Sequence, residues 1–135
     1  MARVLVIDDD KVLREVLRHQ LAVSGHEVTL ARHGGEGLEA AARRDFDAAV
    51  VDLFMPEVEG FETIRHLRRA HPRLAIVAIT GGPQESALLA GHGGVDYLEV
   101  ARLLGAARTL RKPFSAAAIG RAVAESIAEM KSAGP

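Results

Sequence analysis

Short apolar runs alternate along the chain with longer stretches in which apolar residues recur every three or four positions. The runs of strand length are residues 4–7, 27–31, 48–51, 74–79 and 107–111. Helical spacing fills the stretches between them: Leu13, Val16, Leu17 and Leu21, for example, fall on one helix face. A last helix is expected at 114–130. Five strand–helix units in succession predict an α/β fold with a parallel sheet between helices.

The composition of the runs predicts the order of the strands. The first, third and fourth runs are continuously apolar, as expected of strands that are covered on both faces. The second run alternates, and the fifth contains Arg108 and Arg111, so both are expected at sheet edges. The order 2-1-3-4-5 meets these conditions and predicts a doubly wound, five-stranded, flavodoxin-like fold. Ligands of such sheets bind at the carboxyl ends of strands one and three.

Size and charge narrow the class of protein. The chain has 135 residues, a net charge of -1 and no cysteine. The net charge close to zero predicts no direct binding of nucleic acid. The absence of cysteine excludes disulfides and thiol chemistry. The apolar run at 4–7 is too short for a signal peptide or a membrane span, so we expect a cytoplasmic protein without membrane insertion. We expect one domain over residues 1–131, a frayed tail at 132–135 and no attached output domain.

The connection after the fourth strand is unusually long. Residues 81–95 contain five glycines. The length of this connection far exceeds the roughly 2–6 residues that are usual in such loops. We expect a short helix at 84–90 and the next full helix at 96–104. A long insertion at the carboxyl edge of a sheet is typical of a functional segment.

Aspartates gather at the expected ligand-binding edge. Asp8, Asp9 and Asp10 follow the first strand, and Asp52 ends the third. Helix capping alone is one explanation, and it accounts well for Asp10. The other three carboxylates would repel one another unless a cation neutralised them. All-oxygen ligation next to an expected phosphate favours Mg²⁺.

Two further residues at strand ends suggest phosphate chemistry. Lys112, one of only three lysines, follows the fifth strand, where an ammonium can contact a phosphoryl oxygen. The plain alternative is a lysine at a solvent-facing strand end. Pro113 favours a cis peptide bond that would orient this lysine. Thr80 supplies a hydroxyl group, although threonine is common in strands, and Gly81 lets backbone amides approach a ligand. Together with Asp52 as a carboxylate nucleophile, this set suits phosphoryl transfer.

Four motifs in order make the chain resemble a response-regulator receiver domain of two-component signalling. They are "IDDD", "DLFMPEVEG", "AIT" and "RKPF", and the resemblance extends along nearly the whole chain. It implies that Asp52 accepts a phosphoryl group from a histidine kinase or a histidine phosphotransfer protein. It also implies that Thr80 and Lys112 contact the phosphoryl oxygens. Gly60 matches the loop after the acceptor, where turn geometry is its plain role.

The resemblance further implies a cofactor and a mode of signalling. Asp8 and Asp9 would bind Mg²⁺ together with Asp52, and Phe54 would add its backbone carbonyl. The protein would be a stand-alone switch rather than an enzyme with a separate substrate, although it would catalyse its own phosphorylation and dephosphorylation. Output would pass by protein contact through the helices at 96–104 and 114–130 and the strand between them, with the protein as a monomer or a phosphorylation-dependent homodimer.

Two positions depart from the family pattern. Thr109 occupies the position of an aromatic switch residue, and Phe54 stands where a polar residue is often found. These departures leave a phosphorylation-independent, receiver-like binding module as the alternative. A haloacid-dehalogenase-like phosphatase would need a second aspartate at position 54, and a dinucleotide binder would need a glycine-rich loop in place of "DDDKVL".

Overall fold

The computed structural model describes residues 2–53, 59–80 and 97–132. The described strands are β1 (Arg3–Ile7), β2 (Glu27–Ala31), β3 (Ala48–Asp52), β4 (Ala75–Thr80) and β5 (Arg108–Arg111). The described helices are α1 (Lys11–Val23), α2 (Gly34–Arg43), α3 (Glu59–Ala70), α5 (Tyr97–Leu104) and α6 (Ala116–Ser132). Phe54, Gly81 and the helix expected at 84–90 lie outside the described residues.

The strands form one parallel sheet in the order β2-β1-β3-β4-β5, which confirms the predicted topology. The two strands that were expected at the edges, β2 and β5, are at the edges, and every residue of β3 and β4 is buried. Ile7 pairs with Val51, and Asp52 pairs with Ile79. This register brings the carboxyl ends of the central strands to one edge of the sheet.

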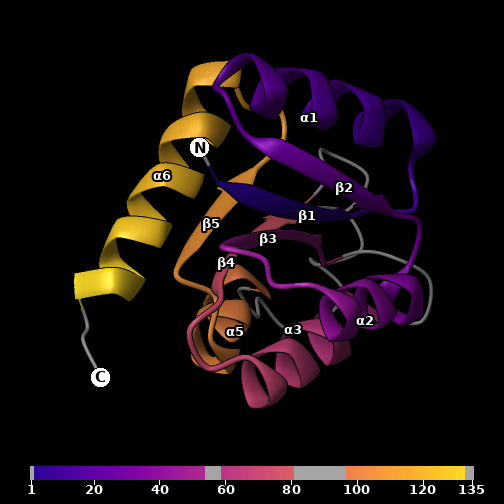
Figure 1. The fold of residues 1–135 in the computed structure, drawn as a ribbon, viewed down its shortest axis with the longest axis vertical. Helices are drawn as coiled ribbons and strands as arrows, with labels where there is room; N and C mark the ends of the chain where they lie inside the picture. Colours follow the sequence, from indigo (N-terminus) through magenta and orange to yellow (C-terminus); the bar gives the residue numbers. More distant parts are fainter. Residues whose placement is uncertain (1, 54–58, 81–96, 133–135) are drawn as a thin grey trace.

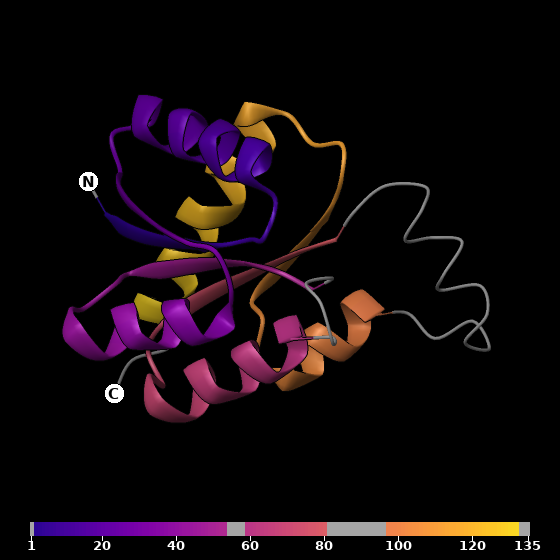
Figure 2. The ribbon, with the colours of Figure 1, turned by 90° about the vertical axis from the view of Figure 1, so that its right-hand side faces the viewer.

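Helices cover both faces of the sheet (Figure 1). On one face α1 and α6 pack over Val4, Val6, Val50 and Val77, while α2, α3 and α5 cover the other face. A quarter turn shows the sheet between these two layers (Figure 2). Two apolar cores, one on each face, therefore hold the strand ends rigidly. None of the described helices is long and apolar enough to cross a bilayer.

Local sequence signals explain where α1 and α6 begin. The Asp10 carboxylate accepts hydrogen bonds from the backbone N–H groups of Val12 and Leu13, at 2.9 and 3.3 Å, and caps α1 as expected. Ser115 does the same for α6 by accepting from Ala118 N–H at 3.0 Å, so this helix begins at Ala116 rather than at residue 114. Ser132, which we expected in the tail, is the last residue of α6.

Candidate functional site

Four strands end in polar residues at the same edge of the sheet. Asp8 follows β1, Asp52 is the last residue of β3, Thr80 is the last of β4, and Lys112 follows β5. Asp8, Asp52 and Thr80 are 0%, 3% and 1% exposed. Burial of this kind is unusual for aspartate, so the fold keeps these groups at a cost in stability.

Three of the predicted metal ligands do come together. One carboxylate oxygen each of Asp8, Asp9 and Asp52 lies within 4.8 Å of the other two. The Asp8 Oδ1 atom accepts a hydrogen bond from Asp10 N–H at 2.8 Å, which fixes the orientation of the carboxyl group. Its Oδ2 atom is buried and has no hydrogen-bond partner within the described part of the chain.

The surroundings of Asp8 raise its pKa to about 7. Burial is the largest cause, and the Asp52 carboxylate is the second. The hydrogen bond from Asp10 N–H and the Lys112 ammonium act in the opposite direction, toward a lower pKa. The site therefore contains more negative charge than its own residues neutralise.

Lys112 supplies the cation that faces both buried acids. Its Nζ atom lies 3.5 Å from Asp52 Oδ2 and 3.8 Å from Asp8 Oδ2. The Lys112 side chain is 21% exposed, less open than a solvent-facing strand end would be, because it turns toward the two acids. Its backbone N–H donates to Thr80 O at 2.9 Å, and the Lys112–Pro113 peptide bond is cis.

This donor set fits a hard divalent cation. Carboxylate oxygens are its preferred ligands, and Oδ2 of Asp8, which accepts no hydrogen bond from the described residues, is a buried acceptor of the kind that a cation would satisfy. A cation here would also offset the repulsion that raises the Asp8 pKa. Phe54, expected to add a carbonyl ligand, lies outside the described residues.

Sequence reasoning missed Arg14, whose guanidinium donates from Nη1 to the backbone oxygen of Asp8 at 2.9 Å. The contact ties α1 to the residue that follows β1. The signal was available in principle, because side chains of a helix lean toward its N-terminus and Arg14 lies in the first turn after the cap.

Gly60 also does more than shape a turn. It lies in the first turn of α3, where an added Cβ atom would stand 2.3 Å from Asp52 O and 2.5 Å from Leu53 Cα. Only glycine, which has no Cβ atom, lets α3 pack this closely against the end of β3 at position 60. Thr109, at the position of the expected aromatic, is half-buried in β5 and pairs with Ala78.

Comparisons with known proteins identify the family of the chain. The family model described as the response regulator receiver domain matches residues 4–124. Response regulator MprA of Mycobacterium leprae (strain TN) is 42% identical over 98 residues, which cover 71% of this chain and 43% of that protein. The chain thus corresponds to less than half the length of this relative.

Solved structures show the same fold. A CheY-like response regulator receiver domain protein from Methanospirillum hungatei JF-1 has a TM-score of 0.81 at 24% identity, with 99% of each chain covered. A response regulator receiver domain protein from Clostridium thermocellum has a TM-score of 0.76 at 28% identity, over 99% of this chain and 100% of that one. The chain therefore belongs to the response regulator receiver domain family, the signalling switches of two-component systems.

Proposed function

We propose that Asp52 accepts a phosphoryl group from a histidine kinase or a histidine phosphotransfer protein, in a reaction that depends on Mg²⁺. The observation that carries this proposal is the position of the Lys112 ammonium, 3.5 Å from Asp52 and 3.8 Å from Asp8, at the strand ends. A capping role does not require a lysine that faces two buried acids.

The chain's own residues account for the chemistry of acceptance. An ionised Asp52 oxygen attacks the phosphorus of a phosphohistidine, the new bond joins oxygen to phosphorus, and the imidazole nitrogen leaves. Phosphoryl transfer needs positioning and charge neutralisation more than covalent assistance. The buried end of β3 positions Asp52, and Lys112 neutralises charge as the phosphoryl oxygens approach.

Asp8, Asp9 and Asp52 would hold the metal ion, together with the carbonyl of Phe54. When bound, Mg²⁺ supplies positive charge against the carboxylates and the phosphoryl oxygens. Because the Asp8 pKa is raised to about 7, Asp8 must lose a proton before it can act as a full ligand. Thr80, at the end of the neighbouring strand, would contact a phosphoryl oxygen through its hydroxyl group.

We further propose that the phosphorylated protein signals by contact with a protein target. The surface formed by α5, β5 and α6 adjoins β4, which ends in Thr80, and includes β5, which Lys112 follows. A rearrangement at these two residues would reach that surface first.

Incubation with acetyl phosphate and Mg²⁺, followed by intact-mass measurement, tests the proposal. We expect a single phosphoryl group on the unaltered protein and none on Asp52→Asn or in the presence of EDTA. Asp45→Asn, an exposed acid next to the opposite edge of the sheet, is the matched control and should be labelled normally.

Labelling of Asp52→Asn at the normal level would refute the proposal. Absence of labelling in the unaltered protein, with target binding retained, would favour the phosphorylation-independent binding module instead. Peptide mapping of the labelled protein assigns the modified residue directly.

A further inference from the structure

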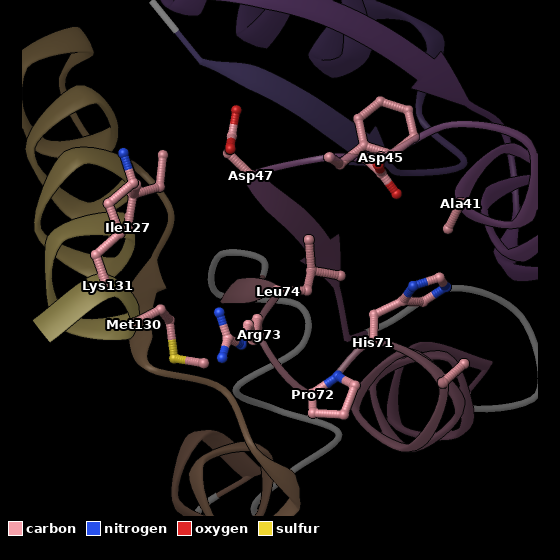
Figure 3. A pocket seen from close by; sticks show the side chains of 12 residues that line it. Ala41, Asp45, Asp47, His71, Pro72, Arg73, Leu74, Ile127, Met130 and Lys131 are labelled. Carbon is pink, nitrogen blue, oxygen red and sulfur yellow. The ribbon is translucent and has the colours of Figure 1, made fainter. Parts of the chain in front are cut away.

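A cleft of about 560 Å³ opens at the amino-terminal ends of the strands, opposite to the carboxyl ends where Asp52 lies. It lies between the connection from α2 to β3, the connection from α3 to β4, and the last turns of α6 (Figure 3). Asp47 and Leu74, which line it, come just before β3 and β4, whereas Asp52 and Thr80 end these strands. The cleft is therefore separate from the proposed phosphorylation site.

The floor of the cleft is apolar. Leu74 is 5% exposed, and Phe46, Ile127 and Met130 are half-buried around it. The volume falls in the range of about 300–1,000 Å³ that is typical of small-molecule sites. Such a floor can bury an aliphatic or aromatic side chain.

The rim of the cleft has acids and bases that do not pair with each other. Asp45 and Asp47 come from one connection and Arg73 from the other, and all three are exposed. In the close view, Asp47 lies on one side of Leu74 and Arg73 on the other (Figure 3). Lys131 adds a second cation from α6. Neither cation has a carboxylate within 4 Å in the part of the chain that the structure describes.

Asp45 and Asp47 form the acidic wall of the cleft, and Arg73 forms the basic wall. Backbone hydrogen bonds hold Asp47 in place. Asp47 Oδ2 accepts a hydrogen bond from Arg3 N–H at 2.9 Å, and the Asp47 backbone bonds to Arg3 O at 2.8 Å and to Ala75 N–H at 3.2 Å. These bonds keep Asp47 at the end of the sheet. The Asp47 carboxylate therefore stays on its own side of the cleft, with one oxygen already bonded to Arg3, and Asp45 offers a second carboxylate on the same side.

We propose that this cleft binds a small zwitterion with an apolar side chain, the chemical class of the hydrophobic amino acids. Its ammonium group lies toward Asp45 and Asp47, its carboxylate lies toward Arg73, and its side chain rests on the apolar floor. A ligand with one charge satisfies only one wall and loses water at the other without a partner. This site goes beyond the proposed phosphorylation of Asp52 and does not depend on it.

The chain is well suited to a direct binding test because it contains no tryptophan and only one tyrosine. Indole fluorescence therefore reports the probe alone. Tryptophan, tryptamine and indole-3-propionate share the indole ring and differ in charge: zwitterion, cation and anion. We expect the anisotropy titration to show tryptophan binding about threefold or more tighter than either of the others. Backbone NMR shifts with tryptophan should centre on residues 45–47, 71–74 and 127–131.

Two substitutions test the acidic and the basic wall separately. Arg73→Gln should weaken the binding of tryptophan and of indole-3-propionate by about threefold and leave the affinity for tryptamine unchanged. Asp45→Asn should weaken the binding of tryptophan and of tryptamine by a similar factor and leave the affinity for indole-3-propionate unchanged. Arg69→Gln, an exposed arginine outside the cleft, is the matched control and should behave like the unaltered protein.

Equal affinities for the three probes would overturn the proposal, as would tightest binding of tryptamine or of indole-3-propionate. The same holds if no probe binds, if the shifts centre elsewhere, or if Arg73→Gln and Asp45→Asn match Arg69→Gln. Circular dichroism of each variant verifies that it is folded, so a loss of affinity can be assigned to the missing charge.

Discussion

Asp8 is a buried acid that the folded protein holds more easily in its protonated form. Its pKa rises from 3.8 to about 7, mainly through burial and then through the Asp52 carboxylate. A folded-state pKa above the unfolded value means that the folded state binds more protons between these two pH values. The contribution of Asp8 to stability is therefore full below about pH 4 and is lost as the pH rises toward 7.

Asp8→Asn should remove this pH dependence. Asparagine keeps the acceptor for Asp10 N–H but has no charge to bury, so the metal-free variant should be more stable than the unaltered protein at pH 8 by about 1–3 kcal/mol. Urea unfolding in EDTA from pH 5 to pH 8 measures the difference. Asp10→Asn, which changes an exposed helix cap, should keep the pH dependence of the unfolding free energy seen in the unaltered protein. Parallel curves for Asp8→Asn and the unaltered protein would contradict the assignment.

At the scale of the elements, close contacts between helices and their neighbours decide how the site is held. The end of β3 touches the first turn of α3 at Gly60, and the ends of α3 and α5 are joined by Arg68. Neither contact follows from the periodicity of its own helix. Each can be broken by one substitution.

Gly60→Ala should destabilise the protein by about 1–3 kcal/mol, because the new methyl group would collide with backbone atoms that cannot move aside. The expected shift of α3 should also slow labelling of Asp52 by acetyl phosphate. Gly35→Ala is the control, since a Cβ atom there would approach only the His33 side chain, at 3.4 Å. Equal unfolding free energies for the two variants would show that α3 tolerates the methyl group.

Arg68 donates to the carbonyl oxygens of Pro72 at 2.9 Å and Gly105 at 2.8 Å, so it links the turns that follow α3 and α5. Burial lowers its pKa, and its carbonyl partners take the place of water. Arg68→Met should cost about 1–2 kcal/mol and speed hydrogen exchange at Ala106. The exposed Arg69→Met is the control. Unchanged exchange at Ala106 would mean that α5 does not depend on this link.

At the scale of the whole molecule, one parallel sheet brings three acids from two strand ends into a single site. A ligand that binds only the folded state stabilises the entire domain. Mg²⁺ should therefore raise the free energy of unfolding by about 1.4 kcal/mol for each tenfold excess over its Kd.

This stabilisation should be larger at pH 8 than at pH 5, because the ion binds ionised carboxylates and Asp8 gains a proton below about pH 7. Urea unfolding with and without Mg²⁺ at the two pH values measures it. Asp8→Asn should reduce the effect at pH 8. A gain that is the same at both pH values would argue against binding at this cluster.

Several features of this protein could be predicted from the sequence alone. Strand order followed from whether each apolar run was continuous or alternating, because that pattern records how many faces of a strand are covered. The acids at the ends of β1 and β3 could be placed at one edge because parallel strands end on the same side. The cap at Asp10 is a local hydrogen-bond pattern and was equally readable.

Only the tertiary structure decided how these parts touch. The inward turn of Lys112, the bond from Arg14 to Asp8 and the close approach at Gly60 depend on distances between atoms of different elements, some adjacent in the chain and some far apart. The cleft at the opposite edge likewise combines two connections with the last turns of α6. Periodicity reports which face of an element is buried, but packing against other elements determines which atoms meet, and that depends on the whole fold.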